Sequence, residues 1–453
     1  MDSFLHIGFD DTDSTQRGCT TYVAALLIEE LRRLDAEFVD YPNLIRLNPN
    51  VPWKTRGNGA LCLRLKIDAS RRRRLVERVV ETVAAEADLD FPGTDPGIVL
   101  YEGKDIPQAL TDFARKTLHR VVRKEEAVRL ITRFHCESFC FKRGRGLIGA
   151  VAAIGEPLFE DHTYELIAYR HKRNRGSVRQ VDGGSVFEMD EQTRGLTFSN
   201  VDYGAKRILI TPRGPDPVLL GIRGDHPEGV KRAFGLLTIH EDVERWVIFR
   251  TNQGTDAHLI DLSGIRHVRP HSAVVLRGSV IAGPRPIPGR HVIVTIGDEG
   301  GCIDCAAYEP TGKFRNVVRR LVQGDVVEVA GGVRPASATH PLTLNLEKLR
   351  VLKLASSTLF RNPVCYLCGK RMESMGTGKG FRCKKCGRRD RGARKIMVPV
   401  ERALYEGLCL PPPCAHRHLM KPRSRYGREK HVNSFPTPLP GFWGLGNYVP
   451  PAS

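Results

Sequence analysis

The sequence predicts a multidomain protein whose N-terminal half, residues 1–265, belongs to the α/β and α+β class. An OB-fold β-barrel at 270–355, a four-cysteine zinc ribbon at 361–395 and a basic C-terminal helix and tail at 396–453 are expected to follow. Three observations lead to this prediction: strands alternate with helices in the N-terminal half, five strands with one late helix come next, and two Cys-x2-Cys pairs follow. With 453 residues the chain is too long for a single core.

In the N-terminal half, apolar runs predict strands and one-sided apolar patterns predict helices. The apolar run 4–9 ends at Asp10, and a helical pattern begins after Gly18, so the acidic residues between them are expected on a strand-to-helix loop. Further strands are expected at 60–67, 97–102, 148–154, 206–211 and 246–250, and further helices at about 70–87 and 107–122.

The second half has the element order of an OB-fold, with a helix at 314–321 between the third and fourth strands. A different small β-barrel would fit the same pattern. A last helix is expected at about 398–406, and Pro411, Pro412 and Pro413 prevent regular structure in the tail that follows. The five barrel strands are expected at 272–281, 291–297, 301–308, 325–333 and 343–354.

The charge of the chain favours a polyanionic partner, because the formal net charge is +19 and the pI is about 9.6. A generally basic surface is the alternative. No apolar run approaches the roughly 20 residues that span a bilayer, and the N-terminus lacks the features of a signal peptide. We therefore expect a cytoplasmic protein with no membrane partner, whose cysteines are metal ligands or buried side chains. The oligomeric state is not predicted.

Two Cys-x2-Cys pairs separated by fourteen residues predict a structural zinc site. Four thiolates at this spacing complete a tetrahedral shell with no open position; two unrelated pairs of buried cysteines are the alternative. The expected ligands are Cys365, Cys368, Cys383 and Cys386.

The same module is basic, with twelve Lys and Arg against two acidic residues between 361 and 395. A small rigid platform of this charge is expected to bind RNA phosphates. The predicted RNA contacts are Lys370, Arg371, Lys384, Lys385, Arg388 and Arg389.

Three carboxylates in four residues, Asp10, Asp11 and Asp13, predict a Mg²⁺ site, since such close like charges repel unless a cation lies between them. The helix that opens after Gly18 with Thr20 and Thr21 can hold phosphate at its free N–H groups. A metal beside an anion site is typical of phosphoryl transfer. The alternative is that Asp11 and Asp13 only cap a helix or turn.

Two basic, glycine-bearing loops are expected to add ATP and phosphate contacts. The loop 48–59 offers Lys54, Arg56 and Gly57, and the loop 142–146 is flexible and basic. The second loop lacks the Walker pattern, so the chain is not a P-loop NTPase, and it could also be a solvated charge run. Its predicted phosphate contacts are Arg143, Gly144, Arg145 and Gly146.

These motifs resemble those of the archaeal tRNA-isoleucine 2-agmatinylcytidine synthetase family. The resemblance covers nearly the whole chain, in order, and the OB-then-ribbon arrangement fits the same family. The matching segments are 8–14, 18–21, 46–50, 52–59, 145–150, 217–224, 251–256, 411–413 and 417–419.

The resemblance implies a ligase that forms a carbon–nitrogen bond and uses ATP, Mg²⁺ and Zn²⁺. It implies that agmatine is attached to C2 of the wobble cytidine in an isoleucine tRNA with a CAU anticodon, through a phosphorylated cytidine, while ATP is split to AMP and two phosphates. It further implies a kinase-like domain interleaved with a ferredoxin-like domain, autophosphorylation of Thr20 or Thr21, and RNA contacts at Arg417 and His418. Agmatine would need a carboxylate, for which Asp202, Asp216, Asp225 and Asp256 lie in or near matching segments.

Two alternatives stay open. One is another ATP-dependent ligase or kinase that acts on RNA, and the other is a non-catalytic nucleic-acid binder built from an OB-fold and a zinc ribbon. The non-catalytic alternative leaves the acidic turn and the two basic loops without a role.

Overall fold

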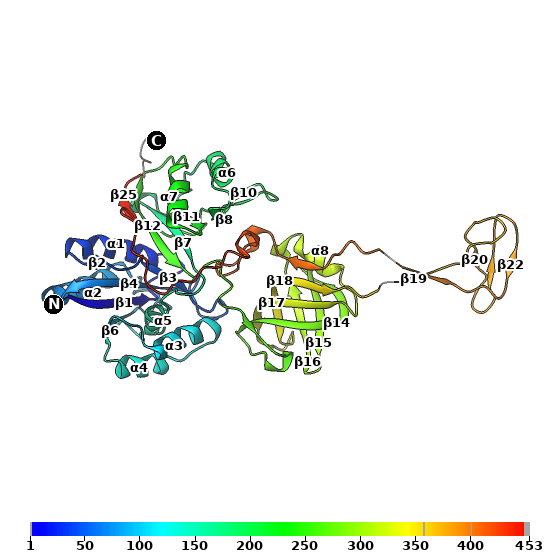
Figure 1. Ribbon diagram of the computed structural model, residues 1–453, viewed down its shortest axis with the longest axis horizontal. Coiled ribbons are helices and arrows are strands. Elements are labelled where there is room, and N and C mark those ends of the chain that lie inside the picture. Colours follow the sequence, from blue (N-terminus) through cyan, green and yellow to red (C-terminus); the bar gives the residue numbers. More distant parts are fainter. Residues whose placement is uncertain (1, 357, 400, 448–453) are drawn as a thin grey trace.

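One eleven-stranded sheet forms the N-terminal half of the computed structural model, which describes residues 2–356, 358–399 and 401–447 (Figure 1). Its order is β6-β5-β1-β4-β3-β12-β7-β11-β8, with β2 beside β4 and β25 beside β12. The sheet has two parts, which join where β3 and β12 pair in parallel and Asn43 lies beside Arg250. The strands are β1 (Asp2–Asp10), β2 (Glu37–Phe38), β3 (Asn43–Arg46), β4 (Gly59–Asp68), β5 (Gly97–Glu102), β6 (Glu137–Cys140), β7 (Thr163–Arg170), β8 (Thr197–Phe198), β11 (Val218–Gly224), β12 (Val243–Thr251) and β25 (Trp443–Leu445).

Helices cover both faces of this sheet. Alternate residues of β1, such as Leu5 and Ile7, pack with α1 (Thr20–Arg33) and α2 (Arg72–Glu86), and the same core continues to α6 (Gly183–Gln192) and α7 (Pro227–Gly235). The opposite face, with Cys62 and Val99, packs against the remaining helices. These are α3 (Gln108–His119), α4 (Lys124–Arg133) and α5 (Leu147–Gly155). A small separate ribbon pairs β9 (Val201–Asp202) with β10 (Arg207–Ile208).

A closed five-stranded barrel follows, in the predicted element order. The ring closes because the first strand pairs with the fourth, and the third with the fifth. Helix α8 (Phe314–Arg319) lies between the third and fourth strands, and its Phe314 and Val318 pack in the barrel core. The barrel strands are β14 (Ala273–Ile287), β15 (His291–Asp298), β16 (Gly301–Ala307), β17 (Val326–Arg334) and β18 (Thr343–Lys353), and β13 (Ile260–Asp261) pairs with β14.

The ribbon module projects from the barrel on a two-stranded stalk and lies far from the N-terminal half (Figure 1). The chain then returns. Its β24 (Gly407–Cys409) pairs with the barrel, and its β25 joins the eleven-stranded sheet. The stalk and ribbon strands are β19 (Thr358–Arg361), β23 (Ile396–Pro399), β20 (Glu373–Ser374), β21 (Phe381–Arg382) and β22 (Arg389–Asp390).

Two predicted elements are wrong. Residues 148–154, expected as a strand, lie within helix α5. The run is apolar at every position and packed on all sides, so it has no hydrophobic periodicity that would distinguish a helix from a strand. The helix expected at 398–406 is absent from the described part of that range, where Pro399 ends a strand and Arg402 instead makes a two-fold ion pair with Asp325 in the barrel.

The strand expected at 206–211 is limited to two residues. None of the helices in the described part of the chain is long and apolar enough to cross a membrane.

Candidate active site

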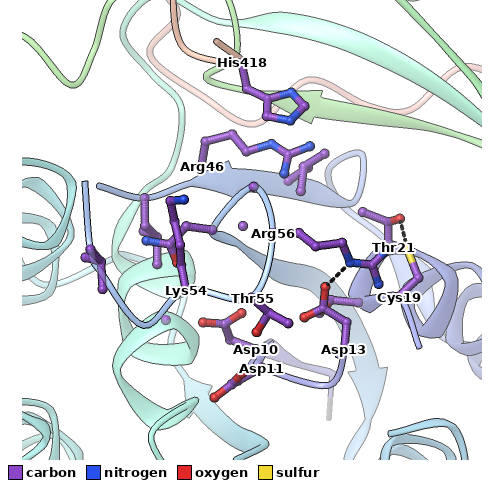
Figure 2. Close-up of a pocket in the computed structure, with 18 of the residues that line it drawn as sticks. Asp10, Asp11, Asp13, Cys19, Thr21, Arg46, Lys54, Thr55, Arg56 and His418 are labelled. Atoms are coloured by element: carbon purple, nitrogen blue, oxygen red, sulfur yellow. Dashed lines mark hydrogen bonds and ion pairs between the residues drawn. The ribbon is translucent and has the colours of Figure 1, made fainter. Parts of the chain in front are cut away.

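A cavity of about 390 Å³ lies where the two halves of the sheet meet. The β1–α1 loop supplies its acidic wall, the loop before β4 supplies basic side chains, and β7 and β11 close the far side (Figure 2). Of the predicted site residues, the cavity is lined by Asp10, Asp11, Asp13, Thr20, Thr21, Lys54, Arg56, Gly57, Arg145 and His418. Residues far apart in the sequence therefore form one site.

Asp11 begins the acidic turn in a left-handed backbone conformation, with φ of 63°. Its carboxylate accepts hydrogen bonds from Nε and Nη2 of Arg145 at 3.1 and 2.8 Å, and from the backbone N–H of Asp95 at 3.3 Å. The basic loop before α5 thus contributes Arg145 to the cavity, as the sequence indicated.

Asp10 ends β1 against the first turn of α5. A Cβ at Gly149 would overlap the Asp10 carboxylate, and one at Gly146 would lie 2.5 Å from its carbonyl oxygen, so two glycines allow this approach. Burial, and then the neighbouring carboxylate of Asp11, raise the pKa of Asp10 well above its usual range. Burial and the adjacent carboxylate thus outweigh the nearby charge of Arg145 at Asp10.

Asp13 is paired with the second basic loop. Nε of Arg56 lies 2.7 Å from Oδ2 of Asp13, and the same guanidinium reaches Asp216 at 3.4 Å and the carbonyl oxygen of Gly18. Arg56 thereby connects the acidic turn to the β10–β11 segment across the cavity.

The first turn of α1 faces the cavity with free donors. Its N-cap residue Cys19 makes no side-chain capping bond, and no acidic residue stands in this turn. Thr12 donates a hydrogen bond of 3.1 Å to Oγ1 of Thr20, and the Cys19 thiol and Thr21 hydroxyl lie 3.1 Å apart. Unsatisfied N–H groups at a helix N-terminus attract phosphate.

The acidic turn suits a divalent cation by its chemistry. Asp10, Asp11 and Asp13 provide hard carboxylate oxygens, and a cation would offset the burial and the repulsion from Asp11 that raise the pKa of Asp10. Yet among the described residues the three aspartates do not form a preassembled metal-ligand group, because Asp11 and Asp13 are paired with arginines. Mg²⁺ would require the carboxylates to leave these partners.

Four predicted phosphate contacts do not line the cavity. Arg143 is exposed, Gly144 packs on Cys140, Gly18 accepts from Arg56, and Gly146 packs on Asp10. Their contact with ATP stays a prediction.

Sequence reasoning missed three residues of the far wall: Arg46, Glu165 and Arg223. Nε of Arg223 donates to Glu165 at 3.0 Å, and its Nη2 donates to Nδ1 of His418 at 2.9 Å. Arg46 and Arg223 fall inside matching motif segments, which was the available signal; Glu165 lies in an apolar strand and gave none.

The four ribbon cysteines converge as a metal site. Their Sγ atoms all lie within 4.8 Å of one another, in the one such group among the described residues. The two glycines after the pairs, Gly369 and Gly387, have positive φ and donate N–H groups to the carbonyl oxygens of Cys365 and Cys383. Four sulfur donors in this arrangement fit Zn²⁺.

The predicted RNA contacts of the ribbon are at its surface. Lys370, Arg371, Lys384, Lys385 and Arg389 are exposed, and Arg388 stacks over the ring of exposed Tyr366 at 4.1 Å. Arg417 is exposed too, whereas His418 turns into the cavity.

A cavity with an acidic turn and free helix donors, followed by a barrel and a basic zinc ribbon, is typical of a nucleotide-dependent enzyme that acts on nucleic acid. The chain belongs to the TiaS family. Models of the TiaS TCKD domain, the TiaS FLD domain and the TiaS C-terminal zinc ribbon domain match residues 6–143, 144–258 and 362–404.

Relatives match over almost their whole length. The TiaS of Methanosarcina acetivorans, by name a 2-agmatinylcytidine synthetase for an isoleucine tRNA, is 42% identical over 438 residues, covering 95% of this chain and 99% of the relative. The TiaS of Pyrococcus horikoshii, which has the same name, is 46% identical over 424 residues, covering 92% and 96%.

Solved structures agree with this match. The crystal structure of a TiaS in complex with its isoleucine tRNA and ATP superposes with a TM-score of 0.84 at 41% identity, covering 93% of this chain and 97% of the other. A TiaS complex with the same tRNA, AMPCPP and agmatine superposes with a TM-score of 0.82 at 38% identity, covering 93% and 96%.

Proposed function

We propose that this protein is an ATP-dependent ligase that joins agmatine to C2 of the wobble cytidine in an isoleucine tRNA with a CAU anticodon. The observation that carries the proposal is the cavity itself, where the acidic turn, the first turn of α1 and the basic loops meet. Full-length similarity to relatives named for this reaction supports it.

ATP would place its phosphates between the first turn of α1 and the side chains of Lys54, Arg56 and Arg145. In the structure Arg56 and Arg145 neutralise Asp13 and Asp11. We propose that a nucleotide and Mg²⁺ separate these pairs, so that the guanidinium groups turn to phosphate and the carboxylates of Asp10, Asp11 and Asp13 hold the metal. When bound, the metal would neutralise phosphate charge.

The reaction would run in two steps. The O2 oxygen of cytidine attacks the terminal phosphoryl group of ATP and forms an O–P bond as the phosphoanhydride bond to ADP breaks, which converts a poor leaving group into a good one. Water then cleaves the remaining phosphoanhydride bond of ADP and gives AMP and the second phosphate. The agmatine amine then forms a C–N bond at C2, the C2–O2 bond breaks, the oxygen leaves with the phosphate, and the amine protons pass to solvent. The base must leave its stack for C2 to be reached.

Agmatine carries a guanidinium group, which a carboxylate would bind. Of the four candidate aspartates, Asp216 lines the cavity, where it lies 3.4 Å from Arg56, while the others are engaged outside the cavity. Asp202 accepts from the N–H of Cys414, Asp225 pairs with Arg425, and Asp256 pairs with Lys348. We therefore favour Asp216.

For autophosphorylation we favour Thr20 by its position in the matching motif, with Thr21 as the alternative, and both residues line the cavity. We also propose that residues 1–265 form one catalytic region with interleaved kinase-like and ferredoxin-like parts. Helix α5 supports interleaving. It lies in the part of the chain that the FLD model matches, which begins at residue 144, yet it packs against β1, which the TCKD model matches.

Incubation of the pure protein with the tRNA, ATP and agmatine tests the proposal, with mass spectrometry of the anticodon nucleosides as the readout. Formation of 2-agmatinylcytidine together with AMP supports it. Phosphorylated or ligated RNA without agmatine would indicate a different ATP-dependent activity, and binding without ATP turnover would indicate a non-catalytic binder.

A further inference from the structure

A second pocket of about 500 Å³ adjoins the active cavity, and we call it the side pocket. The two spaces share a wall made by Arg46, Lys54, Arg56, Arg223 and His418. Four of these residues, Arg46, Lys54, Arg56 and His418, are labelled in Figure 2. The C-terminal tail, from Pro413 to Leu419, and Arg207 of β10 form the other side. The tail therefore builds a compartment next to the site of chemistry.

The residues that line the side pocket include several cations and no acidic side chain among the described residues. The cations are Arg46, Lys54, Arg56, Arg207, Arg223 and Arg417. Arg56, Arg223 and Arg417 have carboxylate partners behind the wall, namely Asp13, Glu165 and Glu347. In the described structure the side chains of Arg46, Lys54 and Arg207 have neither a hydrogen bond nor an ion pair.

The positive groups act on one another. The charge of Arg46, and then burial and Arg223, hold the pKa of His418 well below its usual range. Burial and the nearby Arg417 lower the pKa of Lys54, and burial lowers that of Arg46 to about 10. Like charges repel one another, so an anion bound among these groups would be stabilised.

We propose that the side pocket binds a phosphate of the RNA backbone next to the target nucleotide, while the base of that nucleotide enters the active cavity. This inference rests on the proposed function. It adds Arg46, Arg207 and Arg223 to the RNA-contacting residues.

The lining distinguishes RNA phosphate from the phosphates of ATP. The acidic turn and Thr20, which suit a metal–triphosphate complex, line the cavity and not the side pocket, whereas Lys54 and Arg56 line both. A backbone phosphodiester carries one negative charge and needs only basic side chains. It must also stay outside when its base is flipped into a cavity.

Arg207→Gln tests the proposal. Arg207 is exposed, it lines the side pocket but not the active cavity, and its side chain makes no hydrogen bond or ion pair in the described structure, so its removal leaves no partner unpaired. We expect the tRNA dissociation constant to rise about three- to ten-fold at about 0.1 M salt, and the slope of log affinity against log salt to fall by about one. The affinity for ATP should not change, and Arg207→Lys should restore most of the tRNA affinity. Arg73→Gln on α2, whose side chain is 91% exposed, is the matched control and should bind tRNA normally.

A double-mutant cycle identifies the phosphate. The probes are anticodon stem-loops with a neutral methylphosphonate on the 5′ or the 3′ side of the cytidine. We expect wild type to bind them more weakly than the unmodified stem-loop. At one of the two positions the methylphosphonate and Arg207→Gln together should reduce the affinity no more than either change alone. Additive losses at both positions would overturn the proposal. Equal weakening of ATP and tRNA would overturn it too, because the nucleotide would then be the source of the phosphate. Failure of wild type to form 2-agmatinylcytidine would refute the proposed function but leave this coupling measurable.

Discussion

Arg223 donates a hydrogen bond of 2.9 Å to Nδ1 of His418, a residue 195 positions further along the chain. Through this contact the C-terminal tail, which follows the barrel and the ribbon in the chain, returns to the active cavity. Because Nδ1 is the acceptor, the neutral ring carries its proton on Nε2, next to Gly57.

His418 should therefore act as a neutral hydrogen-bond donor toward the substrate. We expect His418→Ala to lower kcat/KM for tRNA about 10- to 100-fold, and His418→Asn, which keeps an acceptor and a donor, to recover part of the loss. His340→Ala, in a barrel loop that lines neither pocket, serves as the control. A wild-type rate that falls between pH 8 and 6 and becomes flat in His418→Asn would show that the ring titrates there, contrary to its lowered pKa.

Gly149 should be required for the position of Asp10. Gly149→Ala would push the Asp10 carboxylate away, and we expect ATP turnover to fall at least about 100-fold, with a loss of about 1–3 kcal/mol in stability. Gly183→Ala is the matched control, since a Cβ there meets open space. If the reason is correct, Asp10→Ala removes most of the stability cost of Gly149→Ala; an unchanged cost in that background would point to another clash.

The ribbon should contribute RNA affinity and no chemistry. Cys383→Ser removes one of four sulfur ligands, so zinc should be lost and the tRNA dissociation constant should rise about ten-fold or more, while ATP use at saturating tRNA stays normal because the ribbon lies far from the cavity. Cys302→Ser, at an exposed barrel position, is the control. Loss of zinc with unchanged tRNA affinity would contradict this role.

The sheet should lose stability in acid through His6. Nη1 of Arg64 donates to Nδ1 of His6 at 3.0 Å, and Nε2 of His6 donates to the carbonyl oxygen of Gly103 at 2.8 Å. Burial and then the charge of Arg64 lower the pKa of His6 from 6.5 to about 3, against the opposing effect of the Gly103 bond. Between these values the unfolded chain binds a proton that the folded chain does not, so the free energy of unfolding falls as the pH drops.

At pH 4.5 the cost should be about 2–3 kcal/mol relative to neutral pH, at about 1.4 kcal/mol per pH unit. Hydrogen exchange of the β1 and β4 amides measures it. His6→Gln can keep both hydrogen bonds without titrating and should remove this part of the pH dependence; an identical pH dependence in that variant would assign it to other groups.

The sequence predicted local features well where one pattern decided the structure. The strand at 97–102 has the observed bounds, and the cysteine spacing located the metal cluster. It failed at α5, where every position is apolar, and after Pro399, where contact with Asp325 replaces a helix.

The acidic wall of the cavity could be anticipated, since its aspartates are neighbours in sequence. The far wall could not, because Glu165, Arg223 and His418 meet only through the pairing of β7 with β11 and the return of the tail. Long-range contacts of this kind leave no local period or spacing in the sequence.

Oxygen tracing tests the central claim, that a phosphoryl group of ATP is transferred to the O2 oxygen of cytidine. The tRNA would carry ¹⁸O at O2 of the target cytidine, and the released inorganic phosphate would be analysed by mass spectrometry after reaction with ATP and agmatine. The account predicts one ¹⁸O atom in one of the two phosphates for each 2-agmatinylcytidine formed. Product formation with ¹⁸O found in water or AMP, and none in phosphate, would contradict it.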